Sequence, residues 1–199
     1  MQIIAATPSD LEPAVSCLAT AFAHDPITGF LLQTGVGYRE RVARFFSLLM
    51  GARLALGMPV LVARDATGIR GGTMGYTTAR PDWPKRFADD WERFEGAIPG
   101  LGERMAVYDE IADKAKPALP HYYLGVLGLD PTLHGRGLGM QLLKAFCDLS
   151  AADPLSRGIY LETANPSNVS FYERAGFEVT GKGSLGDATL WCMFLRQEA

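Results

Sequence analysis

The stretch LDPTLHGRGLGMQLLKAF, residues 129–146, places three glycines at alternate positions between an apolar run and a helical pattern. The apolar run HYYLGVLGL (121–129) carries no charge before Asp130, which predicts a central strand. The helical pattern continues over 140–152, and we expect that helix to begin near Arg136. The stretch therefore predicts a strand and a helix joined by a glycine-rich turn.

This turn has the chemistry of an anion site. The first backbone N–H groups of a helix lack partners within the helix, and they lie at the positive end of the helix dipole. Gly135, Gly137 and Gly139 lack the β-carbons that would hold a diphosphate away from such amides. The alternative is a tight turn that needs glycine only for its backbone angles, and the three glycines alone do not decide between these interpretations.

Two familiar phosphate loops do not fit the turn. The dinucleotide-binding fingerprint requires a third glycine where this sequence has Met140. The ATP-binding loop ends in Gly-Lys-Ser/Thr, which is absent here. Any phosphate bound at this turn must therefore be recognised by a different motif.

Composition restricts the class of protein and its partners. The 199 residues are 48% hydrophobic and 21% charged, with a formal net charge of -3, which predicts one soluble domain over 1–199. No apolar run is long enough for a membrane span, and no signal-peptide pattern begins the sequence, so we expect a cytoplasmic protein without a membrane partner. Lysine and arginine number 19 against 22 acidic residues, which argues against a nucleic-acid partner. The three cysteines are far apart among apolar residues, which predicts free thiols and no metal site.

The rest of the sequence predicts strands and helices in alternation. The expected strands are 2–6, two within 58–79, 158–164, 177–183 and 188–196, and the expected helices are 9–24, 38–56 and 165–176. The segment DPITGF (25–30) is expected to break the first helix. Residues 80–120 hold two proline-bounded helical patterns rich in Trp and Phe, an insertion that either lines a pocket or packs on the core. This order indicates an α/β or α+β fold.

Two motifs make the sequence resemble the GNAT superfamily of acetyl-CoA-dependent N-acetyltransferases. One is the family's pyrophosphate loop, Gln/Arg-x-x-Gly-x-Gly/Ala, matched here by His134, Gly137 and Gly139, with histidine in place of the usual Gln or Arg. The other is the Tyr-x-x-x-Gly-Phe core within LETANPSNVSFYERAGFEV, matched by Tyr172, Gly176 and Phe177. The similarity is close over 121–196 and only architectural before it. Within the superfamily, FYERAGF followed by a final WCM strand looks most like puromycin N-acetyltransferase and related small-molecule acetyltransferases.

The resemblance implies a fold and a cofactor. The fold is a mixed, mostly antiparallel central sheet flanked by helices, in which the cofactor strand (121–129) splays from its neighbour. Acetyl-CoA would lie along this strand, pairing with the backbone of Leu127, Gly128 and Leu129, and a strand N–H would hold the oxyanion. The pyrophosphate would contact Gly135, Arg136, Gly137, Leu138, Gly139 and Met140.

The resemblance also implies catalytic groups. Tyr172 matches the general acid, a phenol whose pKa lies near that of the CoA thiol, although it could instead be a core tyrosine. Glu162 stands where some relatives have a general base, and a carboxylate in an apolar strand should have a raised pKa. Its side chain could equally lie on an outer face, bonded to another side chain. His121 or a chain of water molecules are the other candidates for removing the proton.

Two asparagines precede Tyr172 on the same predicted helix. Asn165, before Pro166, is first of all an N-cap. Asn168 lies four residues before Tyr172 on one helix face, and the resemblance implies that it reaches the pantetheine arm.

The function expected from these motifs is transfer of an acetyl group from acetyl-CoA to a primary amine of a small molecule, by direct attack on the thioester. One alternative is a protein N-terminal or lysine acetyltransferase, which an open groove would favour. Another is a non-catalytic acyl-CoA-binding module, which could dispense with Tyr172. The bulky insertion at 80–120 favours a closed pocket and a small acceptor, and we expect a monomer or a homodimer.

Overall fold

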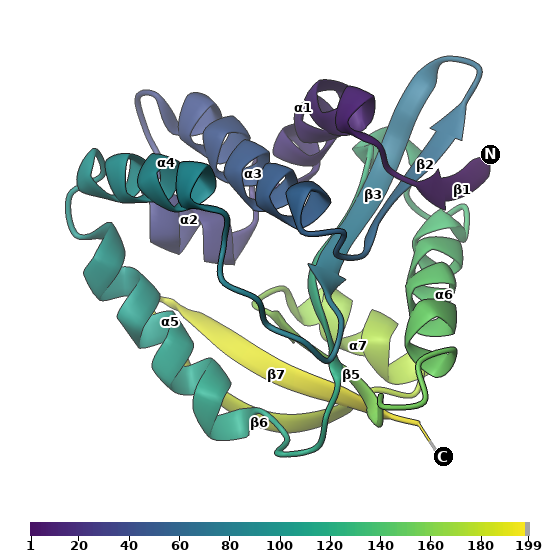
Figure 1. The fold of residues 1–199 in the computed structure, drawn as a ribbon. Coiled ribbons are helices and arrows are strands. Elements are labelled where there is room, and N and C mark those ends of the chain that lie inside the picture. The colour runs from purple at the N-terminus through teal and green to yellow at the C-terminus, as the bar shows by residue number, and fades with distance from the viewer. Residues whose placement is uncertain (198–199) are drawn as a thin grey trace.

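One twisted sheet of seven strands organises the computed structural model, which describes residues 1–197 (Figure 1). In chain order the strands are β1 (Gln2–Ala5), β2 (Val60–Asp65), β3 (Gly68–Tyr76), β4 (Tyr122–Leu129), β5 (Gly158–Thr163), β6 (Glu178–Leu185) and β7 (Ala188–Arg196). Their order across the sheet is β1-β2-β3-β4-β5-β7-β6, and only the β4–β5 pair is parallel. The mixed, mostly antiparallel sheet that the family resemblance implies is confirmed.

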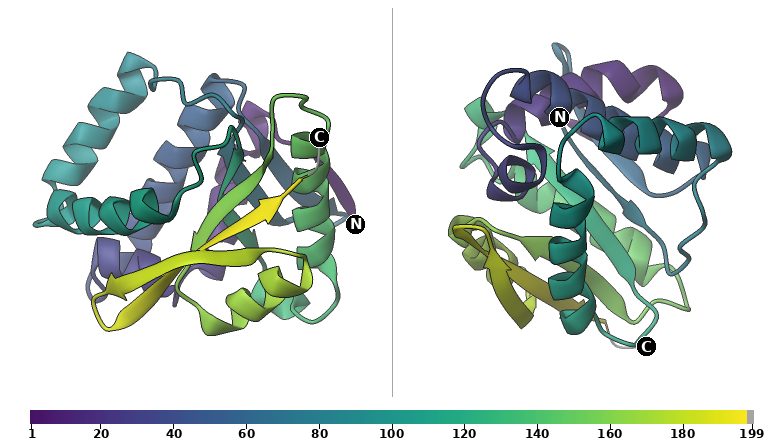
Figure 2. Two further views of the ribbon diagram at one scale, coloured as in Figure 1. Left: turned by 90° about the horizontal axis from the view of Figure 1, so that it is seen from below. Right: turned by 90° about the vertical axis from the view of Figure 1, so that its left-hand side faces the viewer.

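Helices cover both faces of this sheet. They are α1 (Leu11–Ala21), α2 (Pro26–Leu32), α3 (Tyr38–Ala55), α4 (Lys85–Gly96), α5 (Leu101–Ala115), α6 (Leu138–Ala151) and α7 (Pro166–Arg174), with short 3-10 helices at Pro8–Asp10 and Pro131–Leu133. Helices α1 and α3 pack on the β3–β4 region, whereas α6 packs against β2 to β5. Helix α5 covers β6 and β7 on the opposite side of the molecule from α6 (Figures 1 and 2).

The first helical segment differs from its prediction. The expected helix at 9–24 is α1 alone, which ends at Ala21, and the segment expected only to break it forms α2. Asp25 explains the difference, because its side chain accepts a hydrogen bond from the Thr28 amide at 2.9 Å and Pro26 occupies the first helical position. The Asp-Pro pair therefore ends one helix and starts another.

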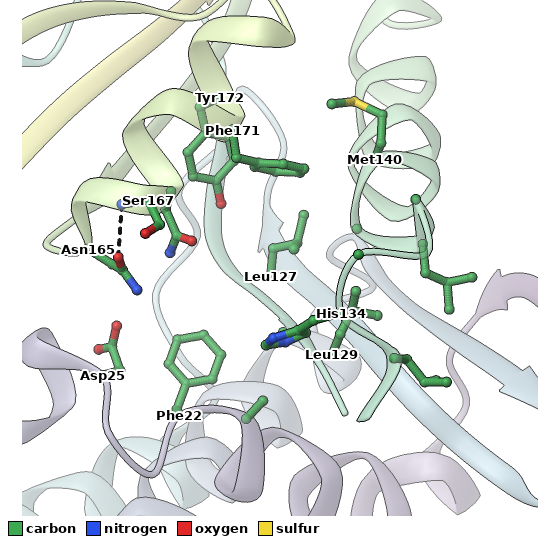
Figure 3. Close-up of a pocket in the computed structure, with 18 of the residues that line it drawn as sticks. Phe22, Asp25, Leu127, Leu129, His134, Met140, Asn165, Ser167, Phe171 and Tyr172 are labelled. Carbon is green, nitrogen blue, oxygen red and sulfur yellow. Dashed lines mark hydrogen bonds between the residues drawn. The ribbon is translucent and has the colours of Figure 1, made fainter. Parts of the chain in front are cut away.

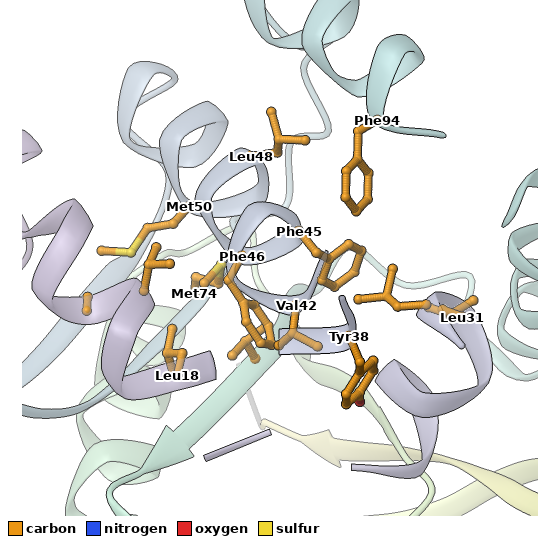
Figure 4. Close-up of a cluster of buried hydrophobic side chains, with 14 of the residues drawn as sticks. Leu18, Leu31, Tyr38, Val42, Phe45, Phe46, Leu48, Met50, Met74 and Phe94 are labelled. Carbon is orange, nitrogen blue, oxygen red and sulfur yellow. The ribbon is translucent and has the colours of Figure 1, made fainter. Parts of the chain in front are cut away.

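A buried cluster joins the N-terminal helices to the sheet (Figure 4). Leu18 of α1 and Val42 and Phe46 of α3 meet Met74 of β3, and all four are at most 2% exposed. The rings of Phe45 and Phe46 pack edge to face, with centroids 5.5 Å apart. This cluster holds α3 firmly against the sheet, next to the middle of β4.

Strand β4 contains a bulge at Gly125. Leu124 and Val126 pair with adjacent residues of β3, so Gly125 has no partner there. The bulge reverses the alternation of side chains: Leu124 packs on the α6 side, Val126 packs on the α1 and α3 side, and Leu127 returns to the α6 side. A strand that is apolar on both faces gives no sign of this reversal in its sequence.

Strand β4 also separates from β5. The two strands pair only at Tyr122 with Ile159 and at Tyr123 with Tyr160. Beyond Tyr123 the edge of β4 that faces β5 has no strand partner among the described residues. The splayed strand pair expected from the family resemblance is confirmed, and it leaves backbone N–H and C=O groups available along 124–129.

Two smaller findings complete the fold. Within residues 1–197, no single helix passes a length and hydropathy test for a membrane span. Helix α1 with its preceding turn and helix α2 pass the test together, but only as a pair that is sharply bent between them. All three cysteines are free thiols, as the sequence predicts: Cys192 is buried, and Cys17 and Cys147 are partly buried.

Candidate active site

Two adjoining cavities meet beside the splayed end of β4. The first has a volume of about 650 Å³ and the second a volume of about 220 Å³. Both are lined by Phe22, Asp25, Leu127, Asn168 and Tyr172. A molecule held in one cavity can therefore reach a molecule held in the other at this junction.

The first cavity is formed by β4, the turn that follows it, the start of α6, and α7 (Figure 3). Most of the residues predicted to bind the cofactor line it, namely Leu127, Gly128, Leu129, Gly135, Gly137, Leu138, Gly139, Met140 and Asn168. His134, which replaces the usual Gln or Arg, also lines it. Arg136 is the exception, because it is exposed and lies outside the lining.

The turn before α6 has the backbone that the anion-site interpretation requires. Gly135 and Gly137 have φ angles of 76° and 75°, and a β-carbon at either would meet nothing within 4 Å. The first helical hydrogen bond runs from Gln141 N to Gly137 O at 3.2 Å, so the amides of 138–140 precede it. The left-handed angles alone favour glycine at Gly135 and Gly137. A β-carbon at Gly139 would instead meet Leu129 and Phe171, at 3.5 and 3.6 Å. The anion-site interpretation of the turn stays a prediction.

Helix α7 brings Tyr172 to the junction of the cavities. The predicted N-cap is confirmed, since Asn165 Oδ1 accepts from the Ser167 amide at 3.0 Å (Figure 3). Tyr172 is 7% exposed, and its hydroxyl points into the cavity opposite Phe22 and Asp25 (Figure 3). Asn168, one turn earlier, donates from Nδ2 to Thr163 Oγ1 at 3.4 Å.

The ionisation of Tyr172 differs from the expected match to a thiol. Burial raises the pKa of Tyr172 above the ordinary phenol value, and the nearby Asp25 carboxylate raises it further. The phenol therefore stays protonated at neutral pH. It keeps a proton to donate, although it is a weaker acid than a thiol.

Strand β5 carries Glu162 into the second cavity. Glu162 and Tyr160 share the face of β5 that α5 covers, so this face is not the outer surface. Tyr108 of α5 donates a hydrogen bond to Glu162 Oε2 at 2.9 Å. Burial raises the pKa of Glu162 to about 7, although hydrogen bonds from the surrounding tyrosines oppose the shift. The raised pKa predicted for this carboxylate is confirmed.

The rest of the second cavity is mainly apolar and aromatic. Phe45 and Trp91 form part of its wall, with ring centroids 5.9 Å apart, and Met105 adds a flexible side chain. Trp91, Met105 and Tyr108 come from the helical insertion at 80–120, which therefore lines a cavity as well as packing on the core.

His121 lies away from both cavities. Its Nδ1 is 2.6 Å from Leu119 O, and its ring packs edge to face on Tyr160 and Phe194. Burial lowers the pKa of His121. This candidate base therefore lies outside the linings of the cavities that hold Tyr172 and Glu162.

Phe22, Asp25 and Arg53 are among the cavity residues that were not predicted from the sequence. Phe22 is the C-cap of α1 and falls within the helix predicted over 9–24. Asp25 begins the segment interpreted only as a helix break, where the Asp-Pro cap was the available signal. Arg53 lies on α3 in the second cavity. It continues the apolar series Val42, Phe46 and Leu49 at helical spacing, and a cation at the next position of such a series is the signal that could have identified it.

Comparison with protein families adds the decisive observation. The model of the acetyltransferase (GNAT) family matches residues 69–177, more than half of the chain, from β3 through the glycine turn to the end of α7. The chain belongs to the GNAT family. The match contains both Leu127 and Tyr172 at the junction of the cavities, and it ends at Phe177.

Curated relatives of this GNAT chain are acetyltransferases by name. It is 27% identical over 132 residues to an L-methionine sulfoximine/L-methionine sulfone acetyltransferase of Pseudomonas paraeruginosa, covering 66% of this chain and 57% of the relative. It is 33% identical over 110 residues to a mycothiol acetyltransferase of Propionibacterium freudenreichii, covering 53% of this chain and 34% of that protein. The alignments thus span only about a third to a little over half of these relatives' lengths.

Solved structures support the GNAT fold over the whole chain. A Corynebacterium glutamicum protein, named histone acetyltransferase HPA2 and related acetyltransferase, aligns with a TM-score of 0.74 at 24% identity. The alignment covers 100% of this chain and 97% of that protein. At this identity the similarity concerns the fold.

Proposed function

We propose that this protein transfers an acetyl group from acetyl-CoA to a primary amine of a small molecule. The observation that carries the proposal is the meeting of the two cavities at Tyr172. One cavity offers a glycine turn and free strand edge, and the other offers a buried carboxylate in an aromatic enclosure. A volume of about 220 Å³ in the second cavity suits a small acceptor better than a protein segment.

The first cavity fits coenzyme A. The amides of Leu138, Gly139 and Met140 would hold the diphosphate, because they precede the first helical hydrogen bond and belong to residues that line this cavity. The unpaired edge of β4 at Leu127 would hold the pantetheine arm through backbone hydrogen bonds. When bound, acetyl-CoA would supply a thioester whose carbonyl carbon forms a bond to the amine nitrogen as its bond to sulfur breaks, which yields an amide and a thiol.

Glu162 and Tyr172 carry out the two proton transfers that accompany this acetyl transfer. Glu162 accepts the proton that the amine nitrogen loses, since its pKa of about 7 leaves a large fraction ionised near neutral pH. Tyr172 gives its phenolic proton to the departing sulfur, because burial keeps the phenol protonated. A β4 amide near Leu127 stabilises the oxyanion. Names of relatives add support, as those proteins are acetyltransferases of small molecules.

The function is tested by release of free CoA thiol. Acetyl-CoA is incubated with the protein and a panel of small primary amines, including L-methionine sulfoximine, and with a lysine-containing peptide. We expect thiol release with at least one small amine and little with the peptide. Thiol release with the peptide alone would favour a protein acetyltransferase. CoA binding without any release would favour the non-catalytic binding module.

A pH profile tests Glu162. We expect kcat/KM to increase with pH through a midpoint near 7, because only the deprotonated carboxylate accepts a proton. In Glu162→Gln we expect this rise of kcat/KM near pH 7 to disappear. A rise that is caused by deprotonation of the acceptor amine should remain. If kcat/KM of the variant still rises through a midpoint near pH 7, Glu162 is not the group that causes the rise.

Tyr108→Phe tests how the pKa of Glu162 is set. The variant removes the hydrogen bond that Tyr108 donates to the carboxylate, so the pKa of Glu162 should rise further. A net hydrogen-bond energy of about 1 kcal/mol corresponds to a shift of the pH midpoint of roughly half a unit to one unit upward. The same substitution in the Glu162→Gln background should produce no shift. An unchanged or lowered midpoint would contradict the assignment.

A further inference from the structure

The second cavity contains a buried cation that has no anionic partner. Arg53 is 4% exposed, and its Nη1 donates to Leu49 O at 3.0 Å. Its Nε is buried without a hydrogen-bond partner, and within residues 1–197 no carboxylate lies within salt-bridge distance of its guanidinium. A buried charge left without a partner is costly, so folding alone does not explain a cation at this position.

The guanidinium of Arg53 lies next to the β4 bulge. It stacks over the Tyr76 ring at 4.5 Å from the centroid. A β-carbon built at Gly125 would lie 2.9 Å from the Tyr123 ring and 3.5 Å from Arg53 Nη2, so the absence of a side chain lets that ring and the guanidinium lie close to the bulge. Both Gly125 and Arg53 line the second cavity. The cation therefore borders the space that the acceptor would occupy.

Among the described residues, the lining of this cavity carries one cation, Arg53, and three carboxyl groups, those of Asp25, Asp109 and Glu162. Glu162 is the carboxyl group suited to an amine, and Arg53 is the lining group suited to an anion. A guanidinium binds a carboxylate through two parallel hydrogen bonds, for which Arg53 has free donors. Burial lowers the pKa of Arg53, and an anion beside it would favour the charged form again.

We propose that Arg53 forms a carboxylate-binding subsite, so that the preferred acceptor is a small amine that also carries an anionic group, as amino acids do. The apolar wall of Phe45, Trp91 and Met105 would take an apolar side chain of that acceptor. This inference rests on the proposed acetyl transfer, and it narrows the acceptor within it.

Three acceptors that share one apolar group test the subsite: L-leucine, L-leucinamide and 3-methylbutylamine. In the unsubstituted protein we expect kcat/KM for L-leucine to exceed the values for the other two amines by at least about 30-fold. This factor corresponds to the free energy that is lost when one partner of a buried charge pair is removed. Arg53→Met should remove most of this preference through KM, and Arg53→Lys should restore part of it. Arg80→Met is the matched control, because Arg80 also lies over the Tyr76 ring but lines neither cavity.

The outcomes separate this inference from the proposed function. Equal rates for the three amines, or a preference that persists in Arg53→Met, would overturn the subsite while leaving acetyl transfer intact. If no amine is acetylated, calorimetry with N-acetyl-L-leucine and N-acetyl-3-methylbutylamine decides the question without turnover. Tighter binding of the carboxylate compound, lost in Arg53→Met, supports the subsite. Equal binding of the two compounds overturns it.

Discussion

Tyr172→Phe should lower kcat by roughly 10² to 10³-fold, within the range for loss of a positioned general acid. The substitution removes only the hydroxyl that points into the junction of the cavities (Figure 3). The KM for acetyl-CoA should change little, because the backbone of β4 and the α6 amides remain in place. Steady-state thiol release, with CoA affinity measured by calorimetry, provides both quantities.

Tyr122→Phe is the matched control for this variant. Tyr122 belongs to the same buried cluster as Tyr172 and is equally buried, but it lines neither cavity. Removing the Tyr122 hydroxyl should leave kcat within about threefold of the unsubstituted protein, because this hydroxyl lies outside both cavities. Equal turnover in Tyr172→Phe and Tyr122→Phe would remove Tyr172 from the proposed chemistry.

Gly137→Glu should abolish CoA binding. The new side chain would enter the open space before the α6 amides, and its carboxylate would repel a diphosphate. We expect affinity to fall by at least about 100-fold, corresponding to about 3 kcal/mol. Calorimetric titration with CoA measures the loss, and circular dichroism reports whether the fold is kept.

Gly57→Glu separates this effect from backbone strain. Gly57 follows α3 with a φ of 65°, and a β-carbon there would also meet nothing within 4 Å. The control thus introduces a similar left-handed strain, about 1–2 kcal/mol, and the same charge at a position outside both cavities. It should bind CoA normally. Undiminished affinity in Gly137→Glu would show that the α6 amides do not hold the diphosphate.

The first cavity could be predicted largely from the sequence because its parts are local. Residues 127–140 form one continuous strand, turn and helix, so the spacing of Gly135, Gly137 and Gly139 carries most of the information. The start of α6 was placed near Arg136 and lies at Leu138, after Gly137 as N-cap. Arg136 itself, included for its position in the loop, is the residue that lies outside the lining.

The second cavity could not be predicted in the same way, because its parts meet only through tertiary packing. Arg53 comes from α3, Trp91 and Tyr108 from the insertion, and Glu162 from β5. The face on which Glu162 lies could not be decided from strand alternation, since both faces of β5 are covered. The β4 bulge is equally hidden, because the strand is apolar on both sides of Gly125.

The separate origin of the two cavity walls has a consequence for engineering. Phe45, Trp91 and Met105 face only the second cavity, whereas the glycine turn faces only the first. A library that varies these three positions would diversify the proposed acceptor cavity while leaving the proposed CoA cavity unchanged. If the proposed function holds, selection for new products can start from this chain without changes to the glycine turn.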